Sequence, residues 1–177
     1  MDETKILQSA LRRIKAIALD VDGVLTDGGM WWGANGEEFK RFSFADIMGI
    51  SLARRMGLTV TLISGEASPL VDRYAEKMNI SDVTKGCRDK ATALRDFARR
   101  NVLDLADVCF MGDDINDLAA MRIAGFSAAP ADAQPEVLAQ AGFRSTCAGG
   151  HGAVRELVNA IISSHELDAA QVWQRRG

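Results

Sequence analysis

Short runs of apolar residues that end abruptly in small or acidic residues constrain the fold of this chain more than any other feature. Three runs stand out, at residues 17–19, 58–63 and 108–111. Runs of this kind are typical of strands that are buried on both faces of a parallel sheet. Segments with helical periodicity separate them, and strands that alternate with helices are typical of α/β proteins. The sequence therefore predicts a doubly wound, mainly parallel sheet.

The other elements are predicted from spacing, turn residues and capping residues. Helices are expected at residues 3–13, 46–56, 67–78, 89–100, 115–123, 134–140 and 152–164, and strands at 15–20, 58–63, 83–84, 108–111, 125–129 and 143–145. Asp46 is expected to cap the second of these helices, because an acidic side chain at that position accepts hydrogen bonds from the first turn. A chain of 177 residues without repeats or a long linker is expected to form one domain, over residues 1–165, followed by a polar tail at 166–177.

The composition excludes several classes of function. A net charge of −3 and a pI near 5.4 argue against a nucleic-acid-binding surface, which is usually basic. The three scattered cysteines, without a CxxC pair, indicate neither a zinc site nor a disulfide framework. The opening residues include early acids and no apolar core of signal-peptide length, and no apolar run is long enough to span a membrane. We expect a soluble, cytoplasmic protein with neither nucleic-acid nor membrane partners.

An aromatic segment follows the first predicted strand and precedes the helix that starts near Asp46. Asn35-Gly36 predicts a two-residue hairpin turn, because both residues tolerate positive φ. Trp and Phe residues flank the turn, and Phe42 and Phe44 alternate with polar residues as in a strand. Such a flap either packs on its own domain or forms an oligomer interface, where aromatic residues are enriched.

Polar residues follow the predicted strands where each strand ends. Asp20 and Asp22 follow the first strand, Ser64 follows the second and Asp113 the third, while Lys90 lies between the last two. Ligands of open α/β sheets bind outside the carboxyl ends of the strands, so we expect these side chains to meet at one edge. Two crowded carboxylates require a cation or a shared proton.

Each of these residues also has an ordinary structural interpretation. The acids can cap helices, Ser64 can stabilise a turn and Lys90 can be a solvated helix cation. Together, however, they supply what cleavage of a phosphate monoester requires, namely a carboxylate nucleophile, a proton donor, a metal ion and hydrogen-bond donors for the phosphoryl oxygens. The sequence therefore predicts Mg²⁺-dependent phosphoryl transfer.

The motifs resemble those of the haloacid dehalogenase superfamily of phosphatases. The matching elements are DVDGVLTDG from Asp20, the SG pair at 64–65, the lone Lys90 and GDDIND from Gly112. With NGEE in the flap and GGHGAVRE near the end, the chain more narrowly resembles the capless family that dephosphorylates 3-deoxy-D-manno-octulosonate 8-phosphate (KDO 8-phosphate), over about residues 14–165. A relative of that family acts on 2-keto-3-deoxynononate 9-phosphate (KDN 9-phosphate).

The resemblance implies a role for each matched residue. Asp20 would attack phosphorus and form an aspartyl-phosphate, and Asp22 would protonate the leaving sugar oxygen and then activate the hydrolytic water. Ser64, the Gly65 amide and Lys90 would bind the phosphoryl group. The implied metal ligands are Asp20, the backbone carbonyl of Asp22 and Asp113, with Asp114 and Asp117 supporting them.

The missing cap domain is the second implication of the resemblance. Most superfamily relatives close a cap over the site, but only about 40 residues separate the acidic loop from Ser64 here. In the resembled family a homotetramer supplies the lid, with hairpins packing together. The resemblance therefore implies that residues 30–44 form an interface of a homotetramer.

Substrate recognition is where the chain departs from the family pattern. Family members typically have TGR, RDGYGIR and GGRGAVRE where this chain has Glu66, the segment 45–51 and His151, so that arginines are missing. Arg binds a carboxylate bidentately, and its loss weakens recognition of a sugar acid. Glu66 with Lys77 instead resembles the KDN 9-phosphate enzyme, and both substrates stay open. The further candidates for substrate contacts are Asp46 and, for the carboxylate, Arg73 or Arg155.

Other classes of function also fit part of the pattern. A broad-specificity phosphatase is one, and a phosphosugar mutase is another, although mutases ordinarily need a larger cap. A phospho-accepting receiver domain also uses an acidic pair, an Asp and a Lys on a doubly wound sheet. There the Lys follows the accepting Asp, whereas Lys90 precedes Asp113.

Overall fold

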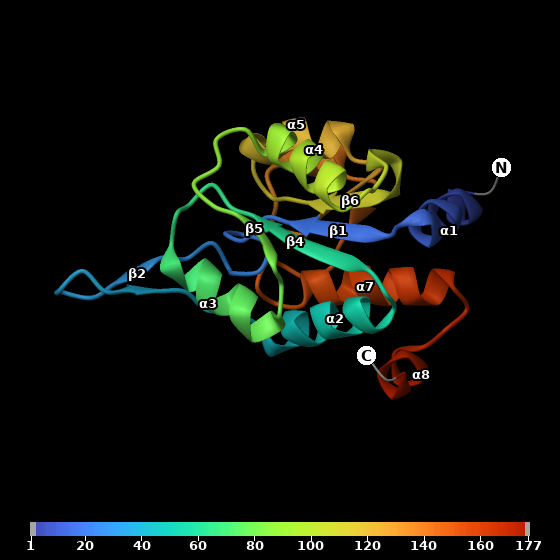
Figure 1. Ribbon diagram of the computed structural model, residues 1–177, viewed down its shortest axis with the longest axis horizontal. Helices are drawn as coiled ribbons and strands as arrows, with labels where there is room; N and C mark the ends of the chain where they lie inside the picture. Colours follow the sequence, from blue (N-terminus) through green and yellow to red (C-terminus); the bar gives the residue numbers. More distant parts are fainter. Residues whose placement is uncertain (1–2, 176–177) are drawn as a thin grey trace.

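Six short strands form one parallel sheet through the middle of the molecule (Figure 1). The computed structural model describes residues 3–175. In the order β5-β4-β1-β6-β7-β8, neighbouring strands pair in parallel. The bounds are β1 (Ala16–Leu19), β4 (Thr59–Ile63), β5 (Asp82–Thr84), β6 (Val108–Met111), β7 (Phe126–Ala129) and β8 (Phe143–Arg144). The predicted doubly wound parallel sheet is confirmed, with β1 between β4 and β6.

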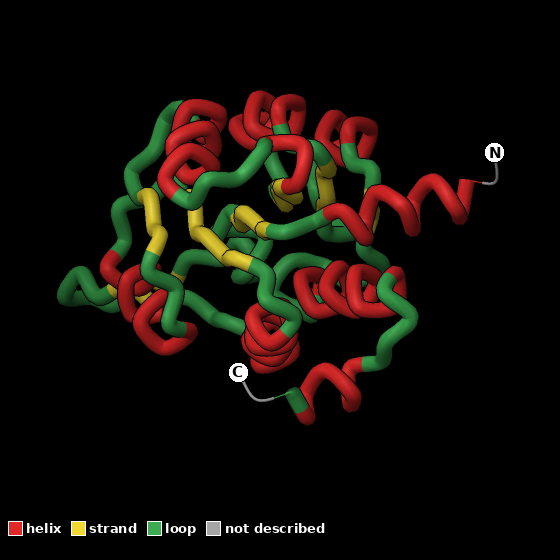
Figure 2. Tube along the Cα trace, turned by 45° about the vertical axis from the view of Figure 1, so that its right-hand side comes forward, coloured by secondary structure: helices red, strands yellow, loops and turns green. Residues whose placement is uncertain are grey.

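Two layers of helices cover the sheet, as Figures 1 and 2 show. One layer shares a core with one face of the sheet and consists of α1 (Glu3–Arg13), α2 (Phe44–Arg55), α3 (Pro69–Met78), α7 (Ala153–Ser164) and α8 (Ala169–Gln174). The other contains α4 (Lys90–Arg100), α5 (Leu118–Ile123) and α6 (Pro135–Gln140). The short 3₁₀ helices η1 (Leu105–Asp107) and η2 (Ile115–Asp117) lie in the loops before β6 and α5.

Strand β1 shows how the sequence holds these layers together. Ile17 and Leu19 pack into the core beside α2 and α7, whereas Ala16 and Ala18 pack into the core beside α4 and α5. Alternate residues of a strand face opposite sides of its sheet, and all four side chains are buried. The apolar run at 17–19 is therefore continuous because both faces of the strand are covered.

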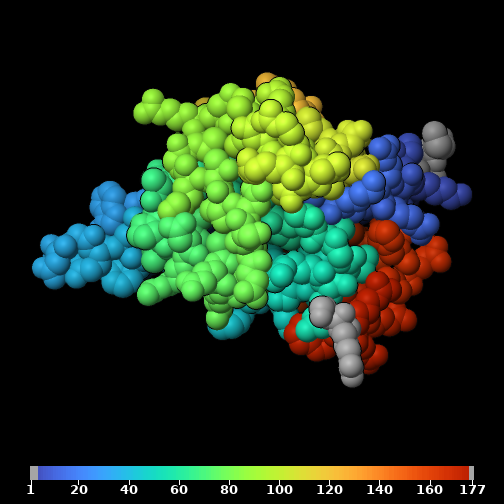
Figure 3. Space-filling model, in the orientation of Figure 1, coloured from blue at the N-terminus to red at the C-terminus, as the bar shows by residue number. Residues whose placement is uncertain are grey.

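The flap is a small antiparallel hairpin of β2 (Trp31–Trp32) and β3 (Glu38–Phe39), which protrudes from the body of the molecule (Figures 1 and 3). The predicted two-residue turn at Asn35-Gly36 is wrong, because the backbone N–H of Gly33 donates to the Glu37 carbonyl at 2.8 Å and leaves three residues, 34–36, in the turn. Of these only Gly36 has a positive φ, +87°, a conformation that glycine adopts without steric cost. Between β1 and β4 the chain otherwise forms only α2, and residues 3–175 contain no separate cap domain. Nor does any helix in that range have both the length and the apolar character needed to cross a bilayer.

Two sequence predictions at the base of the flap are wrong. Phe42 and Phe44 do not continue a strand, because Phe44 already begins α2 and Phe42 stacks on Tyr74 with ring centroids 4.3 Å apart. Asp46 does not cap α2, since the hydroxyl of Ser43 accepts a hydrogen bond from the Ala45 backbone N–H and occupies that position.

The described part of the polar tail packs on the domain. Helix α8 contacts α2, and its Val172 is fully buried. The guanidinium carbon of Arg55 lies 4.2 Å from the ring centroid of Trp173, which adds a cation–π contact.

Candidate active site

The loops that follow β1, β4 and β6 meet at one edge of the sheet. Leu19 is in register with Leu62 of β4 and with Met111 of β6, so the residues after these strands emerge side by side. The backbone N–H of Asp20 donates to the Met111 carbonyl at 3.0 Å, which extends the ladder by one residue. The predicted meeting of these loops is therefore present in the structure.

Gly23 permits the close approach of the first and third loops. It has φ +89°, and a Cβ at this position would lie 2.0 Å from Oδ2 of Asp113. Any larger residue would be strained and would displace that carboxylate. The glycine after the acidic pair is thus a requirement of the site geometry.

Lys90 lies between two carboxylates at the start of α4. Its ammonium group is 2.8 Å from Oδ1 of Asp20 and 2.6 Å from Oδ1 of Asp117, and all three side chains are buried. Burial alone lowers the pKa of Lys90, but the charges and hydrogen bonds of the two carboxylates outweigh burial and raise the pKa above its ordinary value. Lys90 is therefore a fixed positive charge beside Asp20.

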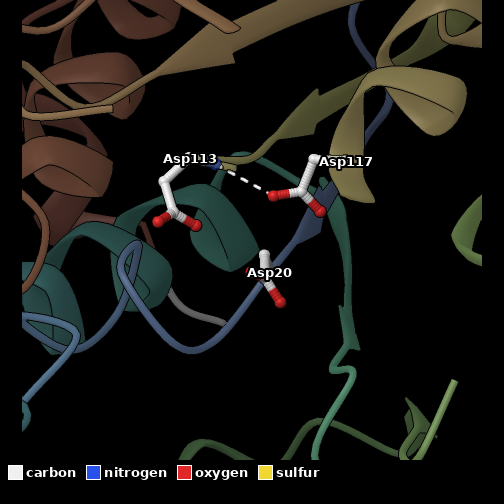
Figure 4. A group of neighbouring side chains, drawn as sticks. All are labelled: Asp20, Asp113 and Asp117. Atoms are coloured by element: carbon white, nitrogen blue, oxygen red, sulfur yellow. Dashed lines mark hydrogen bonds between the residues drawn. The ribbon is translucent and has the colours of Figure 1, made fainter. Parts of the chain in front are cut away.

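Three acidic residues, two of which contact Lys90, lie close together. Asp20, Asp113 and Asp117 each offer an oxygen within 4.8 Å of the others (Figure 4). Oδ2 of Asp117 accepts from the backbone N–H of Asp113 at 2.9 Å, the bond drawn as a dashed line, and from that of Asp114 at 3.3 Å. Asp117 thereby holds the loop that carries Asp113.

Crowding and burial raise the pKa values of two of these acids. Burial, followed by the charge of Asp117, raises the pKa of Asp20 to about 6. Burial, followed by the charges of Asp20 and Asp117, raises the pKa of Asp113 to about 8. A bound cation would relieve the repulsion that causes part of both shifts.

Asp113 provides a direct sign that the cluster suits a metal ion. Its Oδ1 is buried and has no hydrogen-bond partner among the described residues. Buried polar atoms are nearly always paired, and a carboxylate oxygen without a donor is a natural ligand for a hard cation such as Mg²⁺. The donor set of the cluster therefore fits a divalent metal.

A pocket of about 430 Å³ opens above this cluster. Its walls are formed by Asp20, Asp22, Gly28, Gly65, Glu66, Lys90, Asp113, Asp114, Ile115 and Asn116. Most of the predicted site residues thus share one cavity. The sequence predictions did not include Gly28, Ile115 or Asn116, although all three lie inside the matched motifs, because those predictions rest on the acidic residues of the motifs.

Ser64 lies beneath the pocket wall rather than in it. It is fully buried, and its hydroxyl accepts a hydrogen bond from the backbone N–H of Glu66 at 3.1 Å. Its own N–H donates to the Thr84 carbonyl at 2.8 Å. Ser64 therefore shapes the turn that presents Gly65 and Glu66 to the pocket.

The structure does not bring Lys77 or Asp46 to the pocket wall. The Lys77 ammonium lies 5.9 Å from the ring centroid of Phe44, on the outer surface of α3. Asp46 is fully buried, and its carboxylate accepts from the backbone N–H groups of Gly152 at 3.0 Å and Arg155 at 3.1 Å. Asp46 thus caps α7 rather than its own helix, while burial raises its pKa above the ordinary value.

Comparisons with known proteins bear on this geometry. The family model of the haloacid dehalogenase-like hydrolases matches residues 62–157. The 3-deoxy-D-manno-octulosonate 8-phosphate phosphatase of Escherichia coli strain K12 is 35% identical over 159 residues, which are 89% of this chain and 85% of that protein. The chain therefore has a close counterpart along nearly its whole length.

Two solved structures extend the likeness to the fold. The phosphatase of the same name from Moraxella catarrhalis, in complex with a magnesium ion, a phosphate ion and KDO, matches with a TM-score of 0.88 and 33% identity, over 90% of this chain and 92% of that one. The cobalt-bound enzyme from Haemophilus influenzae also has a TM-score of 0.88 and 33% identity, over 93% of this chain and 98% of that one.

Proposed function

We propose that this chain, which belongs to the haloacid dehalogenase-like hydrolases and within them to the family of the 3-deoxy-D-manno-octulosonate 8-phosphate phosphatases, is a Mg²⁺-dependent phosphatase of a phosphorylated 2-keto-3-deoxy sugar acid. The observation that carries this proposal is the buried Oδ1 of Asp113, which has no hydrogen-bond partner within residues 3–175. Asp113 lies beside Asp20, and Oδ1 of Asp20 contacts Lys90. Phosphoryl transfer of this kind requires a metal ligand, here Asp113, next to a carboxylate nucleophile, here Asp20.

In the proposed reaction an oxygen of Asp20 attacks phosphorus, and the bond from phosphorus to the sugar oxygen breaks. The products are an aspartyl-phosphate and a sugar alcohol, because Asp22 gives its proton to the leaving oxygen. The Asp22 carboxylate then takes a proton from a water molecule whose oxygen attacks phosphorus. The bond from phosphorus to the Asp20 oxygen breaks, inorganic phosphate leaves, and both acids return to their starting forms.

The surrounding residues balance the charge of this reaction. Lys90 lies 2.8 Å from Asp20 and offsets the negative charge of the nucleophile and of the phosphoryl group. The side chains of Asp20 and Asp113 and the backbone carbonyl of Asp22 would hold Mg²⁺, which supplies Lewis-acid stabilisation of the phosphoryl oxygens when it is bound. Asp117 keeps Asp113 in place through the backbone of its loop.

The choice of sugar acid is the finer part of the proposal. The name of the matched relatives supports the eight-carbon substrate, KDO 8-phosphate. Glu66 on the pocket wall, where the family typically has Arg, supports the nine-carbon substrate, KDN 9-phosphate. Specificity constants for both substrates, measured on the wild type and on Glu66→Arg, decide between them. An unchanged ratio in Glu66→Arg would show that Glu66 is not the selector.

The exposed aromatic residues of the flap support the expected homotetramer. Trp31, Trp32 and Phe39 are 67%, 76% and 58% exposed on the protruding hairpin (Figure 3). Side chains of this kind are enriched in interfaces. A Trp31→Asp/Trp32→Asp variant should sediment as a smaller species than the wild type. We propose a cytoplasmic location, because the three cysteines are free and the cytoplasm keeps thiols reduced.

The phosphatase proposal is tested by Mg²⁺-dependent phosphate release. Asp20→Asn should abolish release, whereas Asp96→Asn, which changes a partly exposed acid paired with Arg99 on α4, should leave it intact. Normal release by Asp20→Asn would refute the proposal. Similar specificity constants for unrelated sugar phosphates would favour the broad-specificity alternative.

A further inference from the structure

Lys40, in the segment between β3 and α2, has surroundings that are unusual for a lysine of a protruding flap. Its side chain is only 1% exposed, and its ammonium lies 2.5 Å from Oδ1 of Asp22 and 3.5 Å from Oε1 of Glu38. An ammonium group is strongly hydrated, so burying it is unfavourable unless carboxylates replace the water. Lys40 therefore places a buried positive charge next to Asp22 of the acidic loop.

Glu38 is itself held from a third segment. The hydroxyl of Ser68 donates to Oε1 of Glu38 at 2.9 Å. The same hydroxyl accepts from the backbone N–H of Leu70 and so caps α3. A continuous chain of contacts thus runs from the start of α3 through Glu38 and Lys40 to Asp22.

Lys40 contacts Asp22 from outside the pocket wall. Asp22 lines the cavity and is 32% exposed, whereas Lys40 is not one of the residues that form its walls. The ammonium contacts Oδ1, which leaves Oδ2 free of this contact. A carboxylate on a loop has rotamers of similar energy, and a buried charge at one oxygen selects among them.

We propose that Lys40 is the positioning residue of Asp22 and that Glu38 and Ser68 hold Lys40 for this role. The proposal rests on the proposed function, in which Asp22 transfers a proton to the leaving group. General acid catalysis typically contributes about 10²–10⁴-fold and depends on placement within hydrogen-bond reach. Loss of Lys40 should therefore damage reactions that need a proton on the leaving oxygen.

The test compares two leaving groups in Lys40→Met. The sugar-acid phosphate leaves as an alkoxide that must be protonated, whereas p-nitrophenyl phosphate leaves as a stable phenolate. Because kcat/KM reports the steps up to formation of the aspartyl-phosphate, the later hydrolysis that both substrates share does not enter it. We expect kcat/KM for the sugar phosphate to fall by roughly 30-fold or more and that for p-nitrophenyl phosphate by less than about threefold. Lys15→Met is the matched control, because Lys15 pairs with Asp107 at 2.6 Å and precedes β1, at the opposite edge of the sheet. It should change neither constant.

Two further variants separate the possible failures. Asp22→Asn should show the same selective loss in a stronger form, and its absence there would overturn the proposed role of Asp22 itself. If Asp22→Asn shows the selective loss of kcat/KM but Lys40→Met loses activity equally on both substrates or not at all, only the positioning role of Lys40 is overturned. If Lys40→Met shows no cooperative unfolding transition, Glu38→Gln decides, since it keeps Lys40 and removes one charge that holds it. A smaller loss with the same selectivity supports the proposal, and equal losses on both substrates overturn it.

Discussion

Replacing Asp113 with asparagine is expected to stabilise the metal-free protein at alkaline pH and to remove its response to Mg²⁺. Burial, with the charges of Asp20 and Asp117, raises the pKa of Asp113 from 3.8 to about 8. The folded protein therefore keeps a proton that the unfolded chain releases over most of this interval. Because the unfolded state binds fewer protons there, the free energy of unfolding falls as the pH rises.

The size of the effect follows from the pKa and from the exposure of the side chain. Below about pH 4 both states are protonated, and above about pH 8 the loss of stability is complete. At about 1.4 kcal/mol for each pKa unit, the upper limit is about 6 kcal/mol. Asp113 is only half-buried, so we discount this to about 2–3 kcal/mol. Asparagine has the same shape without the charge and should escape this loss.

Urea unfolding in EDTA and in excess Mg²⁺, at about pH 5 and about pH 8.5, measures both parts of the prediction. In EDTA at the higher pH the variant should be more stable than the wild type by about 2 kcal/mol, and at the lower pH the difference should shrink. Mg²⁺ at about 100 times its Kd should stabilise the wild type by about 2.7 kcal/mol and the variant by much less. A less stable variant at about pH 8.5 in EDTA, or equal stabilisation by Mg²⁺, would refute the reasoning.

Three further substitutions test other contacts of the site. Lys90→Met should leave the buried acids Asp20 and Asp117 without a counter-charge and lower the free energy of unfolding in EDTA by about 3–5 kcal/mol, as urea unfolding would show. Gly23→Ala should displace Asp113 and weaken Mg²⁺ binding at least about tenfold in a calorimetric titration, and an unchanged affinity would contradict the packing argument. Asp46→Asn should weaken the cap of α7 and lower stability by about 1–3 kcal/mol. Its KM should stay within about twofold of the wild type, and a raised KM without loss of stability would restore Asp46 to the substrate site.

The parts of the fold and site that sequence reasoning reached depend on local signals. The run at 17–19 predicts a strand because every residue in it is apolar, and the acids that follow must then lie at the carboxyl edge of the sheet. Asp20, Lys90 and Asp113 meet for this topological reason. Parallel strands bring their ends together whatever the helices between them contain.

The parts that it missed depend on contacts between distant segments. Asp46 reads locally as a helix cap, but its partners Gly152 and Arg155 lie more than 100 residues away. No local pattern distinguishes Lys40 in the sequence, and only the closure of the hairpin base onto the acidic loop brings it into contact with Asp22. Periodicity and spacing carry no information about such pairings.

The claim that Asp20 is the nucleophile is tested most directly by trapping its phosphorylated form. Enzyme, Mg²⁺ and substrate are mixed, quenched in acid within one turnover and treated with borohydride, which reduces an acyl phosphate to an alcohol. Mass spectrometry of the peptide that contains residue 20 should then show homoserine in place of Asp20, and only when substrate was present. An unmodified Asp20 with homoserine at Asp113, or no modified acid at all despite rapid turnover, would contradict the account.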